Sequence, residues 1–100
     1  MTLVKVATKD EIPLGMAKIV EANGLPIAIY NVDGTFYATT NTCVHQGGSL
    51  GEGELEDNVI TCPLHGWKYD VTSGVCQIIP SIKIPSYKVE VRGEDIFIEV

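Results

Sequence analysis

Four residues of two uncommon types, arranged in two short clusters, are the part of this sequence that could do chemistry. Cys43 and His45 form the first cluster, and Cys62 and His65 form the second, with residues 46–61 between them. Cysteine thiolates and histidine imidazoles are ligands of soft and borderline transition metals. Glycine or proline lies beside each cluster, which indicates that both are in loops. The sequence therefore predicts a metal site held between two loops, each supplying one thiolate and one imidazole.

Two kinds of metal site use two cysteines and two histidines. Structural zinc has this ligand set, but zinc fingers usually place both cysteines in one pair and both histidines in the other. A binuclear iron–sulfur centre can instead take two cysteines on one iron and two histidines on the other. One cysteine and one histidine per loop, as in this chain, favours the iron–sulfur centre. A zinc-stabilised binding module without a redox role stays open as the alternative.

The two clusters resemble the signature of the Rieske family, which runs Cys-x-His, a spacer, then Cys-x-x-His followed by glycine. The strand-and-turn pattern of residues 5–100 is also similar to that of a small Rieske ferredoxin. The resemblance implies one [2Fe-2S] cluster per chain, with the cysteines and histidines as its cofactor-binding and metal ligands. The residues that match the signature are Cys43, His45, Cys62, His65 and Gly66.

This ligand set favours reduction of the cluster. Four thiolates around two ferric ions and two sulfides leave a dianion, whereas two thiolates and two neutral imidazoles leave a neutral site. An electron enters a neutral site of low dielectric at lower cost. The reduction potential of this class accordingly lies in a range of roughly −150 to +300 mV.

Departures from the pattern of high-potential Rieske proteins predict the lower part of that range. By resemblance, the respiratory type has an extra cysteine in each loop, and these two cysteines form a disulfide. Gly48 and Leu64 occupy those positions here, so that disulfide cannot form. High-potential members also use a serine and a tyrosine to donate hydrogen bonds to cluster sulfurs. Trp67 stands in place of the serine, while Tyr69 is retained.

The loops predicted to carry the site are residues 41–53 and 62–67. Their glycines permit close approach of the backbone, and we expect their amides to point toward the cluster sulfurs. For Gly51 and Gly53 an ordinary turn is the preferred interpretation. By resemblance, Ile79, Pro80 and Ser81 form the proline-containing loop that packs over Rieske clusters. The glycines in the two loops are Gly47, Gly48, Gly51, Gly53 and Gly66.

Cys76 is left over when Cys43 and Cys62 are assigned to the metal site. Its neighbours Val75, Ile78 and Ile79 are apolar, which favours a buried packing role, the usual one for a cysteine outside a disulfide. A redox-sensing thiol is the minority interpretation.

The remaining sequence predicts an all-β fold. Alternating or β-rich segments occur at residues 3–7, 17–21, 27–32, 35–40, 59–61, 67–71, 87–92 and 96–100, with Leu55 before a turn. Asp33-Gly34 and Asp57-Asn58 are hairpin signals. In the last pair of segments, Val89, Val91, Ile96 and Ile98 could share a buried face. We expect a small antiparallel sandwich or barrel of about eight to ten strands, with the two-loop cluster-binding tip at one end.

Length and composition indicate one soluble domain over residues 1–100. The chain has 45% hydrophobic and 20% charged residues and a net charge of −6, which is typical of a soluble globular protein. Residues 1–15 carry four charges and lack the apolar core of a signal peptide, and no apolar run is long enough for a membrane span. We therefore expect a cytoplasmic monomer with no membrane or nucleic-acid partner.

An electron carrier is the function that these features predict. The chain has two histidines, both assigned to the cluster, so neither a mononuclear iron triad nor a Ser/His or Cys/His catalytic triad can be built. The resemblance implies a soluble Rieske ferredoxin, no enzyme in itself, that carries single electrons from an NAD(P)H-dependent ferredoxin reductase to a terminal oxygenase. The alternative within electron transfer is the small Rieske subunit of another oxidoreductase, such as nitrite reductase.

Overall fold

The structure is a computed structural model that describes residues 3–43, 47–64 and 66–100. Over these residues the chain forms ten β-strands and two short 3₁₀ helices, η1 (Lys9–Glu11) and η2 (Leu50–Glu52), and no α-helix. The predicted all-β fold is confirmed. The strands are β1 (Leu3–Thr8), β2 (Ala17–Ala22), β3 (Leu25–Val32), β4 (Thr35–Thr40), β5 (Glu54–Glu56), β6 (Val59–Thr61), β7 (Lys68–Asp70), β8 (Ser86–Tyr87), β9 (Val89–Arg92) and β10 (Asp95–Glu99).

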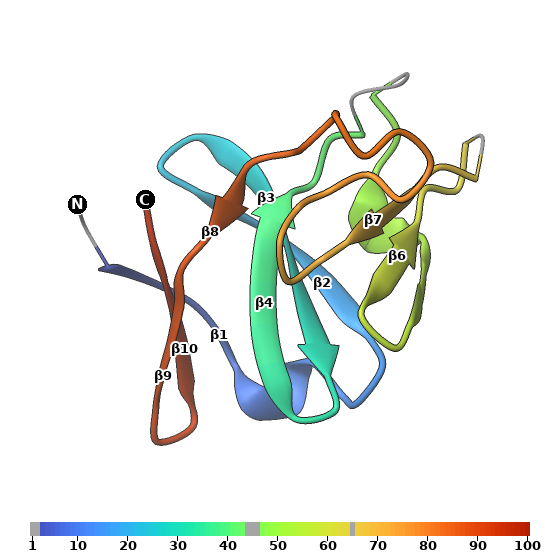
Figure 1. Ribbon diagram of the computed structural model, residues 1–100. Helices are drawn as coiled ribbons and strands as arrows, with labels where there is room; N and C mark the ends of the chain where they lie inside the picture. Colours follow the sequence, from blue (N-terminus) through green and yellow to red (C-terminus); the bar gives the residue numbers. More distant parts are fainter. Residues whose placement is uncertain (1–2, 44–46, 65) are drawn as a thin grey trace.

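Three antiparallel sheets make up the molecule (Figure 1). The first has the strand order β1-β10-β9, the second β2-β3-β4-β8, and the third β5-β6-β7. The first two sheets form the base of the molecule. The small third sheet lies to one side of it and carries the second of the two cysteine loops.

Tight turns with left-handed residues set the register of the hairpins. Asp33 and Gly34 both have positive φ, at 51° and 91°, and join β3 to β4 with Val32 opposite Thr35. This is the conformation that a two-residue hairpin turn requires. Asp57 also has positive φ, at 54°, in the turn between β5 and β6. Both predicted hairpin turns are confirmed.

Strand β3 separates two hydrophobic cores. Its side chains alternate between the two faces of the sheet. Ile27 and Ile29 belong to the core shared by the first and second sheets, whereas Ala28 and Tyr30 belong to the core shared with the third. All four side chains are fully buried. The second of these cores also contains Cys43 and Cys62, so β3 is the wall against which the candidate site is built.

The C-terminal hairpin differs from its prediction. Ser86 and Tyr87 pair with β4 as a separate strand, β8, and only β9 pairs with β10. Val91 lies opposite Ile96 in the expected register, yet 38% of Val91 is exposed. The reason is that β9 is an edge strand of the first sheet, while Ile96 and Ile98 on β10 are central and fully buried.

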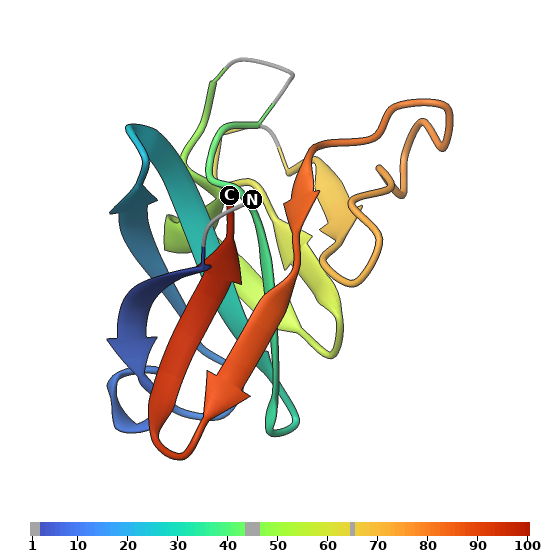
Figure 2. The same cartoon turned by 90° about the vertical axis from the view of Figure 1, so that its left-hand side faces the viewer.

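The loops that carry the cysteines reach the same corner of the molecule. One loop follows β4, the other connects β6 to β7, and the segment between β7 and β8 lies beside them; both views show this arrangement (Figures 1 and 2). Across the described ranges, no helix has the length and apolarity that a membrane crossing would need.

Candidate metal centre

The first cysteine loop is closed by two backbone hydrogen bonds around Cys43. The Cys43 carbonyl accepts a bond from the Gly47 N–H at 2.8 Å, and the Cys43 N–H donates to the Gly48 carbonyl at 2.9 Å. Gly47 has a φ of 71°, in the left-handed region where glycine is favoured. The chain therefore makes a tight turn directly after the cysteine.

The second loop repeats this closure around Cys62. Its carbonyl accepts a bond from the Gly66 N–H at 3.0 Å, and its N–H donates to the Trp67 carbonyl at 2.7 Å. Gly66 has a φ of 75°, almost the same as Gly47. In both loops the glycine lies four residues after the cysteine and the accepting carbonyl five residues after it. Two segments far apart in the sequence thus hold their cysteines in matching backbone settings.

The loops bring both cysteines into one buried cluster of side chains. Cys43 is 1% exposed and Cys62 is 2% exposed, and both belong to the core that includes Tyr30 and Tyr69. Gly48 of the first loop lies directly against the Cys62 sulfur: a Cβ atom built on Gly48 would be 2.6 Å from Cys62 Sγ. The predicted assembly of the two cysteines is therefore present. His45 and His65 lie outside the described residues.

Tyr69 supplies a polar contact to the first cysteine. Its hydroxyl lies 3.2 Å from Cys43 Sγ, and its side chain is fully buried on β7. Either group can donate this hydrogen bond, and in the thiolate form that a metal-bound Cys43 would have, the hydroxyl is the donor. The sequence prediction that Tyr69 donates to a sulfur of the site agrees with this contact. Trp67 is partly buried and packs against the same core, in agreement with a packing role.

Cys76 is fully buried, as predicted, but it also has a polar role that the sequence did not reveal. The N–H of Ile79 donates to Cys76 Sγ at 3.5 Å. The Cys76 N–H donates to the Ile82 carbonyl at 2.9 Å. These bonds hold the base of the proline-containing loop, whose Ile78 and Ile79 are 52% and 40% exposed. Because sequence patterns carry no information on such a sulfur contact, only the apolar neighbours pointed to burial.

Most of the loop amides expected to point toward sulfur atoms are used within the loops. Gly47 and Gly66 donate to the cysteine carbonyls described above, Gly51 donates to Asn41 Oδ1 at 2.7 Å, and Gly53 donates to the Leu50 carbonyl at 3.0 Å. That expectation was wrong for Gly47 and Gly66, whereas the hydrogen bonds of Gly51 and Gly53 agree with the ordinary turn preferred for them. The physical reason is that a tight loop must satisfy its own buried donors.

The acidic residues between the two loops extend away from the cysteines. Glu54 lies opposite Thr61, the residue before Cys62, whereas Glu56 lies opposite Val59 near the turn. The hairpin of β5 and β6 therefore places Glu54 close to the second loop and Asp57 at its far end. Glu54 and Glu56 are both exposed.

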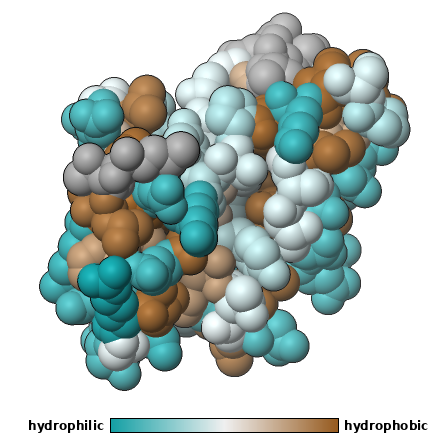
Figure 3. All heavy atoms as spheres, turned by 60° about the vertical axis from the view of Figure 1, so that its left-hand side comes forward, coloured by the Kyte–Doolittle hydropathy of each residue, from teal (hydrophilic) through white to brown (hydrophobic). Residues whose placement is uncertain are grey.

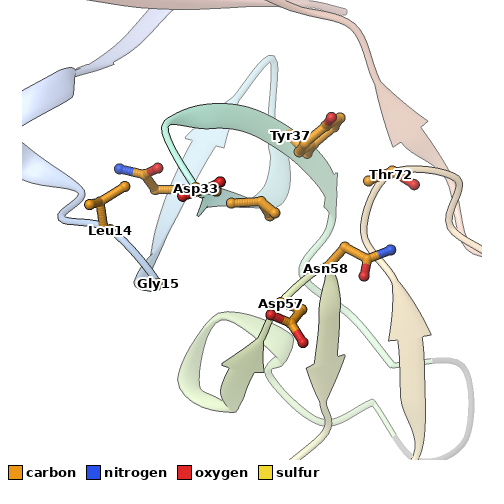
Figure 4. A pocket seen from close by; sticks show the side chains of 9 residues that line it. Leu14, Gly15, Asp33, Tyr37, Asp57, Asn58 and Thr72 are labelled. Atoms are coloured by element: carbon orange, nitrogen blue, oxygen red, sulfur yellow. The ribbon is translucent and has the colours of Figure 1, made fainter.

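A cleft of about 760 Å³ lies elsewhere, between the turn of the β3–β4 hairpin and the turn of the β5–β6 hairpin. Figure 4 shows Asp33 and Asp57 on these two turns, with Tyr37 and Thr72 across the opening. Neither Cys43 nor Cys62 lines the cleft. It is therefore separate from the candidate metal centre.

Comparison with known proteins identifies this arrangement. A family model described as the Rieske [2Fe-2S] domain matches residues 2–88. The chain belongs to the Rieske [2Fe-2S] family. The ferredoxin component of biphenyl 2,3-dioxygenase from Rhodococcus jostii is 33% identical over 101 residues, covering 100% of this chain and 94% of that protein. The iron–sulfur interpretation is thereby supported over the zinc alternative.

Solved Rieske ferredoxins have the same fold. The ferredoxin of carbazole 1,9a-dioxygenase from Nocardioides aromaticivorans superposes with a TM-score of 0.91 at 29% identity, covering 98% of this chain and 97% of that one. A chain in a complex of reduced oxygenase and oxidised ferredoxin of carbazole 1,9a-dioxygenase gives a TM-score of 0.88 at 33% identity, covering 96% and 91%. The predicted fold, with its two-loop tip, is that of these Rieske structures.

The described residues of the site fit the [2Fe-2S] cluster that the family carries, one per chain. Two cysteine sulfurs from opposed loops are buried in one cluster of side chains, and a tyrosine hydroxyl is in place to donate to one of them. The cluster accepts and releases one electron at a time. Burial excludes water from both sulfurs, and with the cluster bound the hydroxyl would stabilise negative charge on Cys43 Sγ.

Replacing Tyr69 with phenylalanine should lower the reduction potential. The hydroxyl bond to Cys43 Sγ is stronger in the reduced, more negative state, so its loss destabilises that state more. A differential loss of about 1 kcal/mol corresponds to a decrease of about 40 mV for one electron. Protein-film voltammetry of the parent and of Tyr69→Phe measures the difference. An unchanged potential, with the visible spectrum of the cluster intact, would contradict the donor role.

Proposed function

We propose that this Rieske protein is the ferredoxin of an oxygenase system, carrying single electrons from an NAD(P)H-dependent reductase to a terminal oxygenase. The observation that supports it best is the pair of buried cysteines in two equally closed loops, in a chain similar to dioxygenase ferredoxins over its whole length. Those relatives are named as the ferredoxins of dioxygenases. In this proposal residues 1–100 form a single Rieske domain. Because its reductase partner uses NAD(P)H, we infer that the protein is located in the cytoplasm.

The cluster ligands in this proposal are Cys43, His45, Cys62 and His65. Support for the cysteines comes from their burial and matching loops, and support for the histidines from the signature Cys-x-His and Cys-x-x-His. A second iron site for oxygen chemistry would need further histidines, and the sequence has two in total. The chain is therefore a carrier, while bond-making chemistry belongs to its oxygenase.

Purified protein tests the carrier function directly. We expect about two irons and two sulfides per chain, no stoichiometric zinc, and a rhombic paramagnetic-resonance signal after reduction with dithionite. Catalytic amounts of a ferredoxin reductase with NAD(P)H should reduce the cluster, and a terminal oxygenase should reoxidise it. Stoichiometric zinc without sulfide would contradict the proposal, and so would a cluster that no reductase of this class reduces.

The ligand assignment predicts different fates for the three cysteines. Cys43→Ala and Cys62→Ala should lose the cluster and much of the stability, because ligation is coupled to folding. Cys76→Ala should keep two irons per chain and the full visible spectrum, although loss of the sulfur contact to Ile79 loosens the proline-containing loop. Iron analysis and visible spectra distinguish these outcomes. Loss of iron from Cys76→Ala would show that the ligands have been assigned wrongly.

Two kinds of surface near the site could contact a partner. Leu64 in the second cysteine loop is 54% exposed, and Ile78 and Ile79 are exposed in the neighbouring loop. The hairpin of β5 and β6 adds the carboxylates of Glu54 and Glu56. Figure 3 shows that on the face it presents, hydrophobic patches are separated by polar side chains. Small apolar contacts next to acidic groups suit a transient complex with a basic partner.

Electrostatic steering by the hairpin can be measured through salt dependence. The bimolecular rate of reduction should fall as salt shortens the Debye length from about 30 Å at 0.01 M to about 8 Å at 0.15 M. Glu54→Gln with Glu56→Gln should flatten this dependence without moving the potential much. The matched control is Glu21→Gln with Glu94→Gln, which removes the same charge from exposed positions outside the hairpin. Equal slopes for the two pairs would show that the acidic hairpin does not steer.

A further inference from the structure

Gly48 has an unusual position between the two cysteines. Its carbonyl accepts the Cys43 N–H at 2.9 Å, while its Cα faces the second loop. A Cβ atom at this residue would lie 2.6 Å from Cys62 Sγ and 3.1 Å and 3.2 Å from Cδ1 and Cγ of Leu64. The backbone of Gly48 thus contacts one cysteine through a hydrogen bond and the other through close packing.

Space rather than conformation is what makes glycine necessary here. Gly47 and Gly66 have positive φ, and a Cβ on either would meet no atom of the described residues within 4 Å. Gly48 lies outside the positive-φ glycines, so another residue could adopt its backbone conformation, but a side chain has no room. A separation of 2.6 Å is far below carbon–sulfur van der Waals contact, so the neighbour must move.

Of the two neighbours, Leu64 can move and Cys62 is restrained. Leu64 is 54% exposed and can rotate into solvent. Cys62 is 2% exposed, and its N–H and carbonyl are both bonded, to Trp67 and Gly66. Displacement of the sulfur must therefore come from rotation about the side-chain torsion, away from a staggered rotamer, or from breaking the closure of the second loop.

We propose that Gly48 is a positioning residue for the cluster. Its Cα, which carries no side chain, packs against Cys62 Sγ and holds that sulfur in place, while its carbonyl holds Cys43 through the hydrogen bond from the Cys43 N–H. One residue of the first loop thereby sets the position of the second loop's cysteine ligand. The inference rests on the proposed ligand role of Cys62, and it adds a residue that binds no metal itself.

Gly48→Ala in the cluster-loaded protein is the test. We expect a shifted midpoint potential, altered g values in the paramagnetic-resonance spectrum, and bleaching of the visible absorption up to about tenfold faster, the factor expected for the cost of an off-rotamer side chain. The control is Gly47→Ala. It adds the same methyl one residue earlier, where no atom of the described residues lies within 4 Å, and it strains the loop through its positive φ.

Removal of the leucine side chain separates the two contacts of Gly48. In Gly48→Ala/Leu64→Ala the contact with Leu64 is relieved and the contact with Cys62 remains, so the altered potential and g values should persist relative to Leu64→Ala alone. If Gly48→Ala does not accumulate as folded protein, this less crowded pair is compared with Leu64→Ala in the same measurements.

Three results would overturn the proposal. They are parent-like values for Gly48→Ala, the same shift in Gly47→Ala, and recovery of the values of Leu64→Ala in the double variant. The last of these would assign the effect to Leu64 rather than to Cys62. Failure of the proposed carrier function would be recognised separately, because the parent protein itself would then lack iron, sulfide or reduction by a reductase.

Discussion

The structure depends on keeping two cysteine sulfurs buried together although they come from separate loops. Each sulfur is carried by a loop that closes on itself through its cysteine carbonyl and N–H. This closure gives hydrogen-bond partners to buried backbone groups. Each of these groups would destabilise the fold by about 1–3 kcal/mol if it were buried without a partner. The left-handed glycines four residues after each cysteine make the turns possible. Local geometry therefore fixes each cysteine, and packing between the loops has only to fix their relative position.

Strand β3 supplies the rigid wall for that packing. Its alternate side chains are fully buried on both faces, so it belongs to two cores at once. One core holds the base sheets together, and the other holds the small third sheet and both cysteines. The Tyr30 hydroxyl, bonded to Thr39 Oγ1 at 2.9 Å, keeps its polar end satisfied inside the second core, and burial raises the pKa of this side chain to about 12. A displacement of the first or second sheet would therefore be transmitted to the two cysteines through β3.

Much of the fold and of the site could be predicted because local patterns determine them. Asp33-Gly34 specifies a hairpin turn, and the sequence motifs of Cys43 and Cys62 indicated that these two cysteines would come together, as they do in one buried cluster of side chains. What the sequence could not show were relations that depend on tertiary contacts. Tyr87 pairs with β4 instead of continuing β9, and Val91 is exposed because β9 lies at a sheet edge. The hydrogen bond from Ile79 to the Cys76 sulfur depends on the path of the loop, which the sequence pattern does not specify.

The glycines of the two cysteine loops also show what the sequence pattern could not predict. In sequence Gly47 and Gly48 look alike, as adjacent residues of a permissive loop. In the structure Gly47 has a left-handed backbone, and among the described residues no atom would lie within 4 Å of a Cβ built on it, while Gly48 has a sulfur atom against it.

The surface around the buried sulfurs divides the tasks of a carrier between two kinds of side chain. Exposed apolar residues such as Leu64 and Ile79 can exclude water from a contact, and short-range contacts of this kind act mainly on dissociation rates. In the proposed steering role, the carboxylates of the β5–β6 hairpin act at longer range and mainly on association rates. Since Glu56 and Asp57 extend away from the second loop, the negative charge lies to one side of the site rather than over it. In that role a partner attracted by the charge would be oriented before the apolar side chains meet it, and it would not have to remove these carboxylates from water at the apolar contact.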